Sequence, residues 1–160
     1  MIILNSKFHT VRGYELKEYG KGSLTPALED YLEMIYRNSL EEAYIRVNTL
    51  ASLLNVKDSS ASKMVKKLGE LGLVNYEKYG IITLTEKGKR EGEFLLIRHN
   101  IIENFLSFIG CKENTLVQTE LIEHYISPST VENIEILYNF FYDNKDLLER
   151  YINYREVNSK

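Results

Sequence analysis

The clearest pattern in the chain is an apolar stripe that follows the dipeptide Thr25-Pro26. Its positions i, i+3, i+4, i+7 and i+8 have the spacing of one buried helical face. They are Leu28, Tyr31, Leu32, Ile35 and Tyr36. Thr25 suits the N-cap and Pro26 the first helical position, while Asp30 and Glu33 share the opposite face. The pattern predicts an amphipathic helix with an acidic outer side.

Two shorter helical patterns follow. The first has Asn48 as its expected cap and turns inward Leu50, Ala51, Leu53 and Leu54. The second begins after Val56, where Asp58 or Ser59 is placed to cap or to charge the first turn favourably. Its apolar stripe comprises Ala61, Met64, Val65, Leu68 and Leu71. We expect both helices to bury these stripes.

Two short strands are predicted next, at residues 73–77 and 81–84, with a turn at Lys78-Tyr79-Gly80. Thr85 then caps a long helix that runs to about Ile109. The order helix, short helix, basic helix and hairpin is that of a winged helix-turn-helix. Residues 1–24 have no clear period and are expected to form a polar N-terminal arm.

The second half of the chain is predicted to be wholly helical and strongly apolar. Its apolar residues include Phe94, Leu95, Ile101, Ile102, Phe105, Leu106, Ile109, Ile134, Leu137, Tyr138, Phe140, Phe141 and Leu147. A small winged domain needs less apolar surface than this, so part of it is expected to form a subunit interface. A plain intramolecular core is the competing interpretation.

The predicted fold class is therefore mostly α with a small β-hairpin wing. We place a winged helix-turn-helix domain at residues 25–90 and an all-helical domain at residues 91–160.

Charge is distributed unevenly along the chain, whose net charge is −3. Residues 57–90 hold eight basic and four acidic side chains, a balance of +4, whereas residues 112–160 hold five basic and nine acidic ones, a balance of −4. A basic segment in an acidic chain favours one face that binds a polyanion.

The basic helix presents hydroxyl and ammonium groups on its outer side, as a helix that enters the DNA major groove does. Serine hydroxyls hydrogen-bond base edges or phosphates, and lysines neutralise phosphates. The hairpin tip would reach the neighbouring DNA backbone. The expected DNA-binding residues are Lys57, Ser59, Ser60, Ser62, Lys63, Lys66, Lys67, Lys78 and Tyr79. The alternative is a winged domain used for protein contacts.

Cys111 is the single cysteine, so an intrachain disulfide is excluded. No apolar segment reaches membrane-spanning length, and the apolar run at residues 1–4 is too short for a signal peptide. These features are typical of a cytoplasmic protein.

Glu120, Glu123 and His124 lie at positions i, i+3 and i+4, within an arc of roughly 100° on one helical face. Two carboxylates and an imidazole on one face suit a divalent cation. The same arrangement is the wet side of an ordinary amphipathic helix, with Leu121 and Ile122 on the other side. The spacing alone leaves both interpretations open.

Several stretches match a known family in residue identity and in order: 24–36, 59–68, 76–79, 84–88, Arg98-His99 and 120–124. With them, the chain resembles the diphtheria-toxin-repressor family of metal-dependent repressors, most closely its manganese-transport-regulator branch. The resemblance extends over nearly all of the chain after the N-terminal arm. One departure is Asp58, which stands where the family often has proline.

In that branch the metal ligands come from the first helix, the linking helix and the helix after it. The resemblance therefore implies a ligand set of Asp30, Glu33, His99, Glu120, Glu123 and His124. The iron-sensing branch usually has methionine at the position of Asp30 and cysteine at that of Glu120. Oxygen and imidazole donors suit Mn²⁺, and Fe²⁺, Zn²⁺ or Cd²⁺ can substitute. Four carboxylates exceed the charge of one divalent ion, which indicates two ions per subunit.

The resemblance implies a homodimeric, Mn²⁺-activated transcriptional repressor that binds a palindromic operator and controls metal-ion uptake genes. A repressor of the same fold that responds to Fe²⁺ or Zn²⁺ is the first alternative. A winged regulator that senses an organic ligand is another. A carboxylate-bridged metalloenzyme is the remote alternative, because such helical bundles also combine carboxylates and histidines. We do not expect an enzyme, because no nucleophile–base pair stands out.

Overall fold

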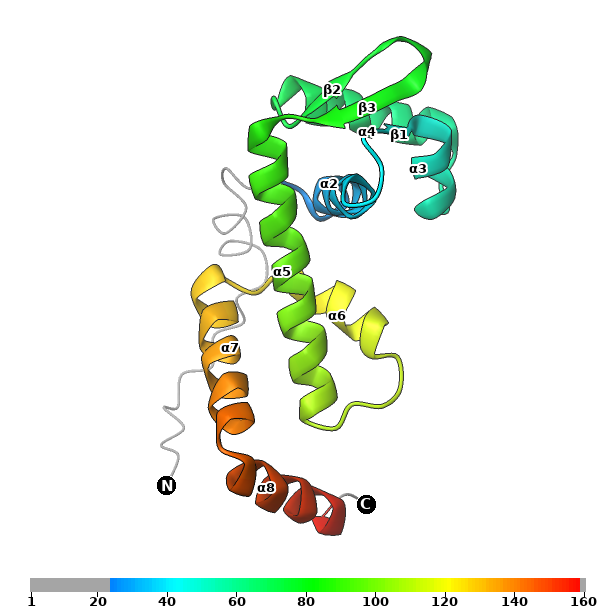
Figure 1. The fold of residues 1–160 in the computed structure, drawn as a ribbon. Helices are drawn as coiled ribbons and strands as arrows, with labels where there is room; N and C mark the ends of the chain where they lie inside the picture. Colours follow the sequence, from blue (N-terminus) through cyan, green and yellow to red (C-terminus); the bar gives the residue numbers. More distant parts are fainter. Residues whose placement is uncertain (1–23, 159–160) are drawn as a thin grey trace, which may run out of the picture.

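The structure is a computed structural model that describes residues 24–158. The predicted N-terminal arm therefore lies, except for Leu24, outside the described residues. Within the described range the chain forms seven α-helices and a three-stranded antiparallel sheet (Figure 1). A winged helix-turn-helix occupies one end and a helical half the other, so the predicted fold class is confirmed.

Helix α2 (Pro26–Ser39) begins where the sequence predicts. The Thr25 hydroxyl accepts a hydrogen bond from the Leu28 N–H at 3.4 Å, and Pro26 occupies the first turn. The apolar stripe is buried from Leu28 to Ile35, and it forms the centre of the first hydrophobic core. Helix α2 therefore holds the winged half together.

Helix α3 (Val47–Leu53) departs from two predictions. Its N-cap is Arg46 and not Asn48, whose side-chain oxygen instead accepts a hydrogen bond from the adjacent Thr49 N–H. Leu53, predicted to point inward, is exposed because it borders an open cavity. Leu50 and Ala51 were also predicted to point inward, and both are buried in the first core.

Helix α4 (Asp58–Glu70) is the basic helix of the helix-turn-helix. It starts after Lys57, and Asp58 lies in the first turn without forming a side-chain cap, so its carboxylate favours the helix through the macrodipole alone. Ala61, Val65 and Leu68 are buried as predicted. Leu71 is exposed, contrary to prediction, because it is the C-cap residue where the chain leaves the helix.

The wing is a small sheet in the order β1-β3-β2. Strands β2 (Val74–Tyr76) and β3 (Ile81–Leu84) form the predicted hairpin. The two-residue strand β1 (Ile45–Arg46) adds to the outer edge of β3 and was not predicted. The tip is the short helix η1 (Lys78–Gly80), where Tyr79 adopts a φ of 65°.

Helix α5 (Glu86–Phe108) is capped by Thr85, whose hydroxyl accepts from the Gly88 N–H at 3.0 Å. It packs closely on the winged half through two buried glycines. A Cβ at Gly88 would collide with the Leu73 carbonyl oxygen, and one at Gly92 would lie 2.6 Å from Tyr36 Cβ. Only glycine permits this close approach. Because α5 continues unbroken through residue 90, the domain boundary placed there stays a prediction.

The helical half consists of the end of α5 with α6 (Thr115–Glu123), α7 (Pro128–Asp143) and α8 (Lys145–Asn158). A second, smaller core forms around Ile102, Leu106 and Val131. Next to it, Phe108 contacts the rings of Tyr138, Phe141 and Tyr151. Part of the apolar surface is therefore an intramolecular core, as the competing interpretation held.

Other apolar side chains of the helical half remain uncovered. Ile136, Leu137 and Phe140 of α7 are exposed in the single chain. None of the described helices combines the length and apolar character needed to cross a membrane.

Candidate metal centre and nucleic-acid interface

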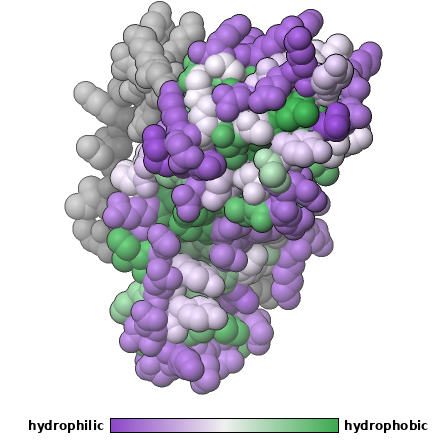
Figure 2. All heavy atoms as spheres, turned by 45° about the horizontal axis from the view of Figure 1, so that its top comes forward, coloured by the Kyte–Doolittle hydropathy of each residue, from purple (hydrophilic) through white to green (hydrophobic). Residues whose placement is uncertain are grey.

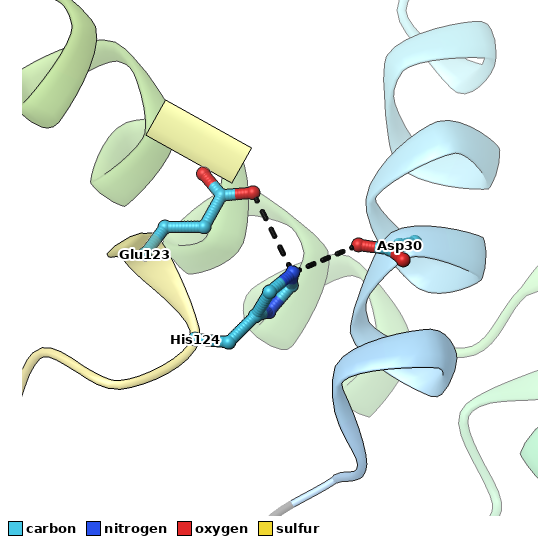
Figure 3. Close-up of side chains that lie close together, drawn as sticks. All are labelled: Asp30, Glu123 and His124. Atoms are coloured by element: carbon cyan, nitrogen blue, oxygen red, sulfur yellow. Dashed lines mark ion pairs between the residues drawn. The ribbon is translucent and has the colours of Figure 1, made fainter. Parts of the chain in front are cut away.

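A cavity of about 860 Å³ lies between the winged half and the helical half. Helix α2 contributes Asp30 and Glu33 to its lining, α5 contributes His99, and the end of α6 contributes Glu123 and His124. These residues belong to three elements that are distant in sequence. Figure 3 shows the side chain of Asp30 on α2 directed toward those of Glu123 and His124.

Asp30, Glu123 and His124 form a first cluster of potential metal ligands. His124 Nε2 lies 3.0 Å from Asp30 Oδ1 and 3.9 Å from Glu123 Oε1. One ligand atom from each of the three residues lies within 4.8 Å of the other two. The three side chains therefore surround a volume that a single cation can share.

Glu33, His99 and Glu123 form a second cluster, and all three are buried. His99 Nδ1 lies 2.8 Å from Glu123 Oε2 and 3.8 Å from Glu33 Oε1. Glu123 thus uses one carboxylate oxygen in each cluster and connects them. Its exposure of 2% leaves it little freedom to leave this position.

The histidines carry altered proton affinity. Hydrogen bonds with Asp30 and Glu29 raise the pKa of His124 from 6.5 to about 9, against the opposing effect of burial. The hydrogen bond with Glu123 raises the pKa of His99 above its ordinary value, again against burial. At neutral pH a protonated His124 therefore compensates part of the negative charge of the carboxylates. The carboxylates that line the cavity thus favour positive charge there, and in this structure protons on the histidines supply it.

Two expectations from the sequence need qualification. Glu33 was predicted on the outer side of α2, which is wrong: it is 8% exposed and lies beside His99 of α5 and Glu123 of α6. Glu120 lines the same cavity but is exposed, and it belongs to neither of the two clusters. Its role as a ligand stays a prediction.

Sequence reasoning missed Glu29 and Arg98. The Glu29 carboxylate accepts a hydrogen bond from Arg98 at 2.7 Å and pairs with His124 Nδ1 at 2.8 Å. Burial alone would raise the pKa of Glu29, but these two partners lower it below its ordinary value. The available signal was an arginine in the apolar part of the long helix, beside His99. A second cation, Arg37, pairs with Glu33 one turn earlier on α2, at 2.7 Å.

The predicted DNA-binding residues lie on one end of the molecule, in α4 and at the tip of the wing. Figure 2 shows mainly hydrophilic side chains at this end. All of them are exposed except the half-buried Ser62, whose hydroxyl lies 3.2 Å from the Tyr76 hydroxyl of the wing. Ser62 therefore links the helix to the hairpin in this structure. Tyr79 is 88% exposed at the tip.

Two family models cover most of the chain. The model described as "Iron dependent repressor, N-terminal DNA binding domain" matches residues 23–82, and "Iron dependent repressor, metal binding and dimerisation domain" matches residues 85–151. The HTH-type transcriptional regulator MntR of Oceanobacillus iheyensis is 43% identical over 120 residues, which are 74% of this chain and 82% of that protein. The chain belongs to the iron-dependent repressor family.

A further relative and a solved structure place this iron-dependent repressor in the same family. The HTH-type transcriptional regulator MntR of Geobacillus thermodenitrificans is 39% identical over 137 residues, 85% of this chain and 97% of that protein. Among solved structures, that of the manganese regulator SloR matches with a TM-score of 0.64 and 32% identity. The match covers 73% of this chain and 55% of the SloR chain, so this chain spans about half the length of that neighbour.

Family membership decides several of the open alternatives. The chain is a metal-dependent transcriptional repressor with a DNA-binding and a dimerisation domain, and it is not an enzyme. The metalloenzyme alternative is therefore set aside, as is a winged domain that serves protein contacts alone. The winged half, with α4 and the hairpin, lies within the matched DNA-binding domain.

Proposed function

We propose that this repressor is activated by Mn²⁺ and acts in the cytoplasm as a homodimer on a palindromic operator of metal-ion uptake genes. The observation that carries the proposal is the shared carboxylate of Glu123, which joins two ligand clusters between the winged and helical halves. The winged domain is taken as residues 25–90 and the helical domain as residues 91–160.

The proposed metal ligands are Asp30, Glu33, His99, Glu120, Glu123 and His124. Five of these belong to the two clusters, and Glu120 lies on the same cavity wall. All six offer oxygen or imidazole nitrogen, the donors that suit Mn²⁺. The names of the relatives agree, since they are called MntR and SloR is described as a manganese regulator. Fe²⁺, Zn²⁺ and Cd²⁺ are the ions that this donor set also accepts.

The charge and the two clusters support a proposal of two ions per subunit. Asp30, Glu33, Glu120 and Glu123 contribute four negative charges when the site is free of protons, which two divalent ions neutralise. Each cluster offers one histidine, and the carboxylate of Glu123 is common to both. Divalent ions bound by these residues would supply the positive charge that offsets the repulsion between the carboxylates.

The ligands connect the two halves of the molecule. Asp30 and Glu33 lie on α2, which packs against α3, α4 and α5, whereas Glu123 and His124 lie at the end of α6. When Asp30 and Glu33 are held against Glu123 and His124, the position of α2, and with it that of α4, is fixed relative to the helical half. In a dimer this sets the separation of the two copies of α4 that must enter successive major grooves.

The DNA-binding surface is proposed to be α4 with the wing. The residues are Lys57, Ser59, Ser60, Ser62, Lys63, Lys66, Lys67, Lys78 and Tyr79. The exposed lysines suit contacts with phosphates, which supply much of the affinity for DNA. Ser62 would need to exchange its contact with Tyr76 for one with DNA, so we expect it to contribute least.

The proposal is tested by selecting a duplex from a random-sequence pool with Mn²⁺-loaded protein. The recovered duplex is then titrated with protein with and without Mn²⁺. We expect Mn²⁺ to raise the affinity by about 5–150-fold, the usual range for coupling between sites. The Glu123→Gln variant should lose this gain while binding DNA weakly at low salt. Equal affinity with and without Mn²⁺, in wild-type protein, contradicts the proposal.

The alternative activators are separated in the same experiment. Anaerobic titrations that replace Mn²⁺ with Fe²⁺ or Zn²⁺ show which ion activates at the lowest free concentration. An organic effector would leave the affinity unchanged when a chelator is added, because the response would not depend on the metal.

A further inference from the structure

We infer that Glu29 and Arg98 are positioning residues that orient the His124 ring so that its Nε2 atom is the metal-binding nitrogen. The inference rests on the proposed metal site and goes beyond it, because neither residue belongs to the proposed ligand set. It assigns a function to a buried ion pair that connects the two halves of the molecule.

The two nitrogens of His124 face different partners. Nδ1 lies 2.8 Å from Glu29 Oε2, whereas Nε2 lies 3.0 Å from Asp30 Oδ1 and 3.9 Å from Glu123 Oε1. Figure 3 shows the two dashed lines to Asp30 and Glu123 starting from one ring nitrogen, between the two carboxylates. A carboxylate is an acceptor only, so both ring nitrogens donate here, Nδ1 to Glu29 and Nε2 to Asp30. A metal ion in the cluster would take the place of the Nε2 proton, whereas Glu29 would keep the proton on Nδ1 and hold the ring in this orientation.

Arg98 keeps Glu29 in this role. The same oxygen that faces His124, Oε2, accepts a hydrogen bond from Arg98 at 2.7 Å. The Arg98 and Glu29 side chains are only 6% and 13% exposed, and the Arg98 charge compensates that of Glu29. Glu29 is therefore less available as a competing metal ligand than Asp30, the next residue on the same helix, whose side chain is 48% exposed.

The arrangement couples three elements. Glu29 lies on α2, Arg98 on α5 and His124 at the C-cap of α6. Arg98 is adjacent to His99, so the helical turn that supplies the histidine of the second cluster also supplies the cation that fixes the histidine of the first. Hydrogen-bonded partners of this kind commonly change metal affinity by about 10–100-fold when they are removed.

The first test compares Mn²⁺ affinities by calorimetry. Glu29→Ala removes the acceptor and should weaken binding by about 10–100-fold, whereas Glu29→Gln keeps an oxygen that can accept from both donors and should recover most of the affinity. Glu86→Ala is the matched control, because it removes a carboxylate that pairs with Lys89 on the exposed first turn of α5. If Glu29→Ala binds Mn²⁺ like the Glu86→Ala control, the inference is wrong.

The second test identifies the bound nitrogen directly. Protein labelled with ¹⁵N at its three histidines is loaded with ¹¹³Cd²⁺, a diamagnetic substitute for Mn²⁺. We expect coupling between cadmium and Nε2 of His124 in wild-type protein, and partial or complete loss of this coupling in Glu29→Ala. Coupling through Nδ1 of His124 in wild-type protein overturns the inference and leaves the metal site intact. Absence of coupling to either nitrogen of His124 overturns the proposed metal site, and the inference with it.

Discussion

At the scale of single residues, Glu123 holds the most constrained position in the candidate site. Its two carboxylate oxygens face two different histidines, and its side chain has almost no contact with solvent. Burial of an ionised carboxylate is costly unless it is paired. In the structure that pairing comes from His99 and His124.

The two clusters lead to a prediction about metal stoichiometry. Asp30→Asn should weaken the first cluster only, because Asp30 belongs to that cluster alone. Glu123→Gln should weaken both, because its carboxylate is common to them. Metal analysis after equilibrium dialysis against Mn²⁺ should therefore show one ion fewer for Asp30→Asn and the largest loss for Glu123→Gln. Equal losses in the two variants contradict the division into two clusters.

A second prediction at this scale concerns pH. The pKa of His124 is raised from 6.5 to about 9 in the folded chain, so its protonated form contributes stability that is fully present below pH 6.5. This contribution disappears as the pH rises through about 9. Urea unfolding of metal-free protein, with a chelator present, should show stability falling across this interval. His124→Asn should reduce this slope, and the raised pKa of His99 accounts for a further part of it. An unchanged slope in the variant would show that His124 does not contribute.

At the scale of elements, the packing of α5 on the winged half depends on the absence of side chains at two positions. Gly88 lies against the Leu73 backbone, and Gly92 lies against Tyr36. A shift of backbone would be needed to accept even a methyl group at Gly88. The junction between the wing and the long helix is consequently intolerant of substitution, although it is remote from the proposed ligands.

We predict that Gly88→Ala destabilises the protein by at least about 1–3 kcal/mol, the usual cost of overpacking. Gly69→Ala is the control, since a Cβ there would meet its nearest neighbour, the Val74 carbonyl oxygen, at an ordinary 3.7 Å. Because alanine is the better helix former, this control should be neutral or slightly stabilising. Urea midpoints of the two variants and the wild type test both expectations. Equal midpoints for the two variants would disprove the close contact.

The elements also show how far the sequence determines this structure. Helices with a regular apolar period, such as α2 and α5, were predicted with their caps, because periodicity and capping are local properties. Strand β1 was missed because two residues carry no period and gain their strand structure only by pairing with β3. The burial of Glu33 was missed because it results from α5 and α6, which are distant in sequence.

The candidate site, like the fold, was predicted only in part from the sequence. The spacing of Glu120, Glu123 and His124 indicated a shared face, but only family resemblance supplied Asp30, Glu33 and His99 as partners. Glu29 and Arg98 could not be found by this route, because their role depends on which nitrogen of His124 faces the cavity. That is a property of side-chain packing, which the residue pattern does not contain.

At the scale of the whole molecule, charge is separated along its length. The basic segment lies in the winged half, whereas the helical half is acidic, so the winged end is favoured as the side that approaches DNA. The acidic half would be repelled by phosphates, which helps to define the orientation of the complex.

This charge separation predicts the salt dependence of DNA binding. Lys63→Ala and Lys66→Ala should each weaken binding across all sequences and reduce the slope of log affinity against log salt by about 1. Lys145→Ala, at the start of α8 in the acidic half, should leave the slope unchanged. Fluorescence anisotropy over a range of salt concentrations provides the measurement. If the slope changes equally in all three variants, the salt dependence reflects the net charge of the protein and not contacts between α4 and the phosphates.

The unbroken course of α5 gives the molecule a mechanical property. His99 lies thirteen residues after Glu86, the first residue of the helix, a distance of about 20 Å along the axis at 1.5 Å per residue. A tilt of about 5° at the metal end would displace the wing end by about 2 Å, roughly the difference between a hydrogen bond and no contact. In a two-fold dimer both wing ends would shift in this way. The distance between the two copies of α4 would then depart from the half-site spacing of about 34 Å. Helix α5 is thus long enough to act as a lever, which converts a small movement at the ligands into gain or loss of contacts with DNA.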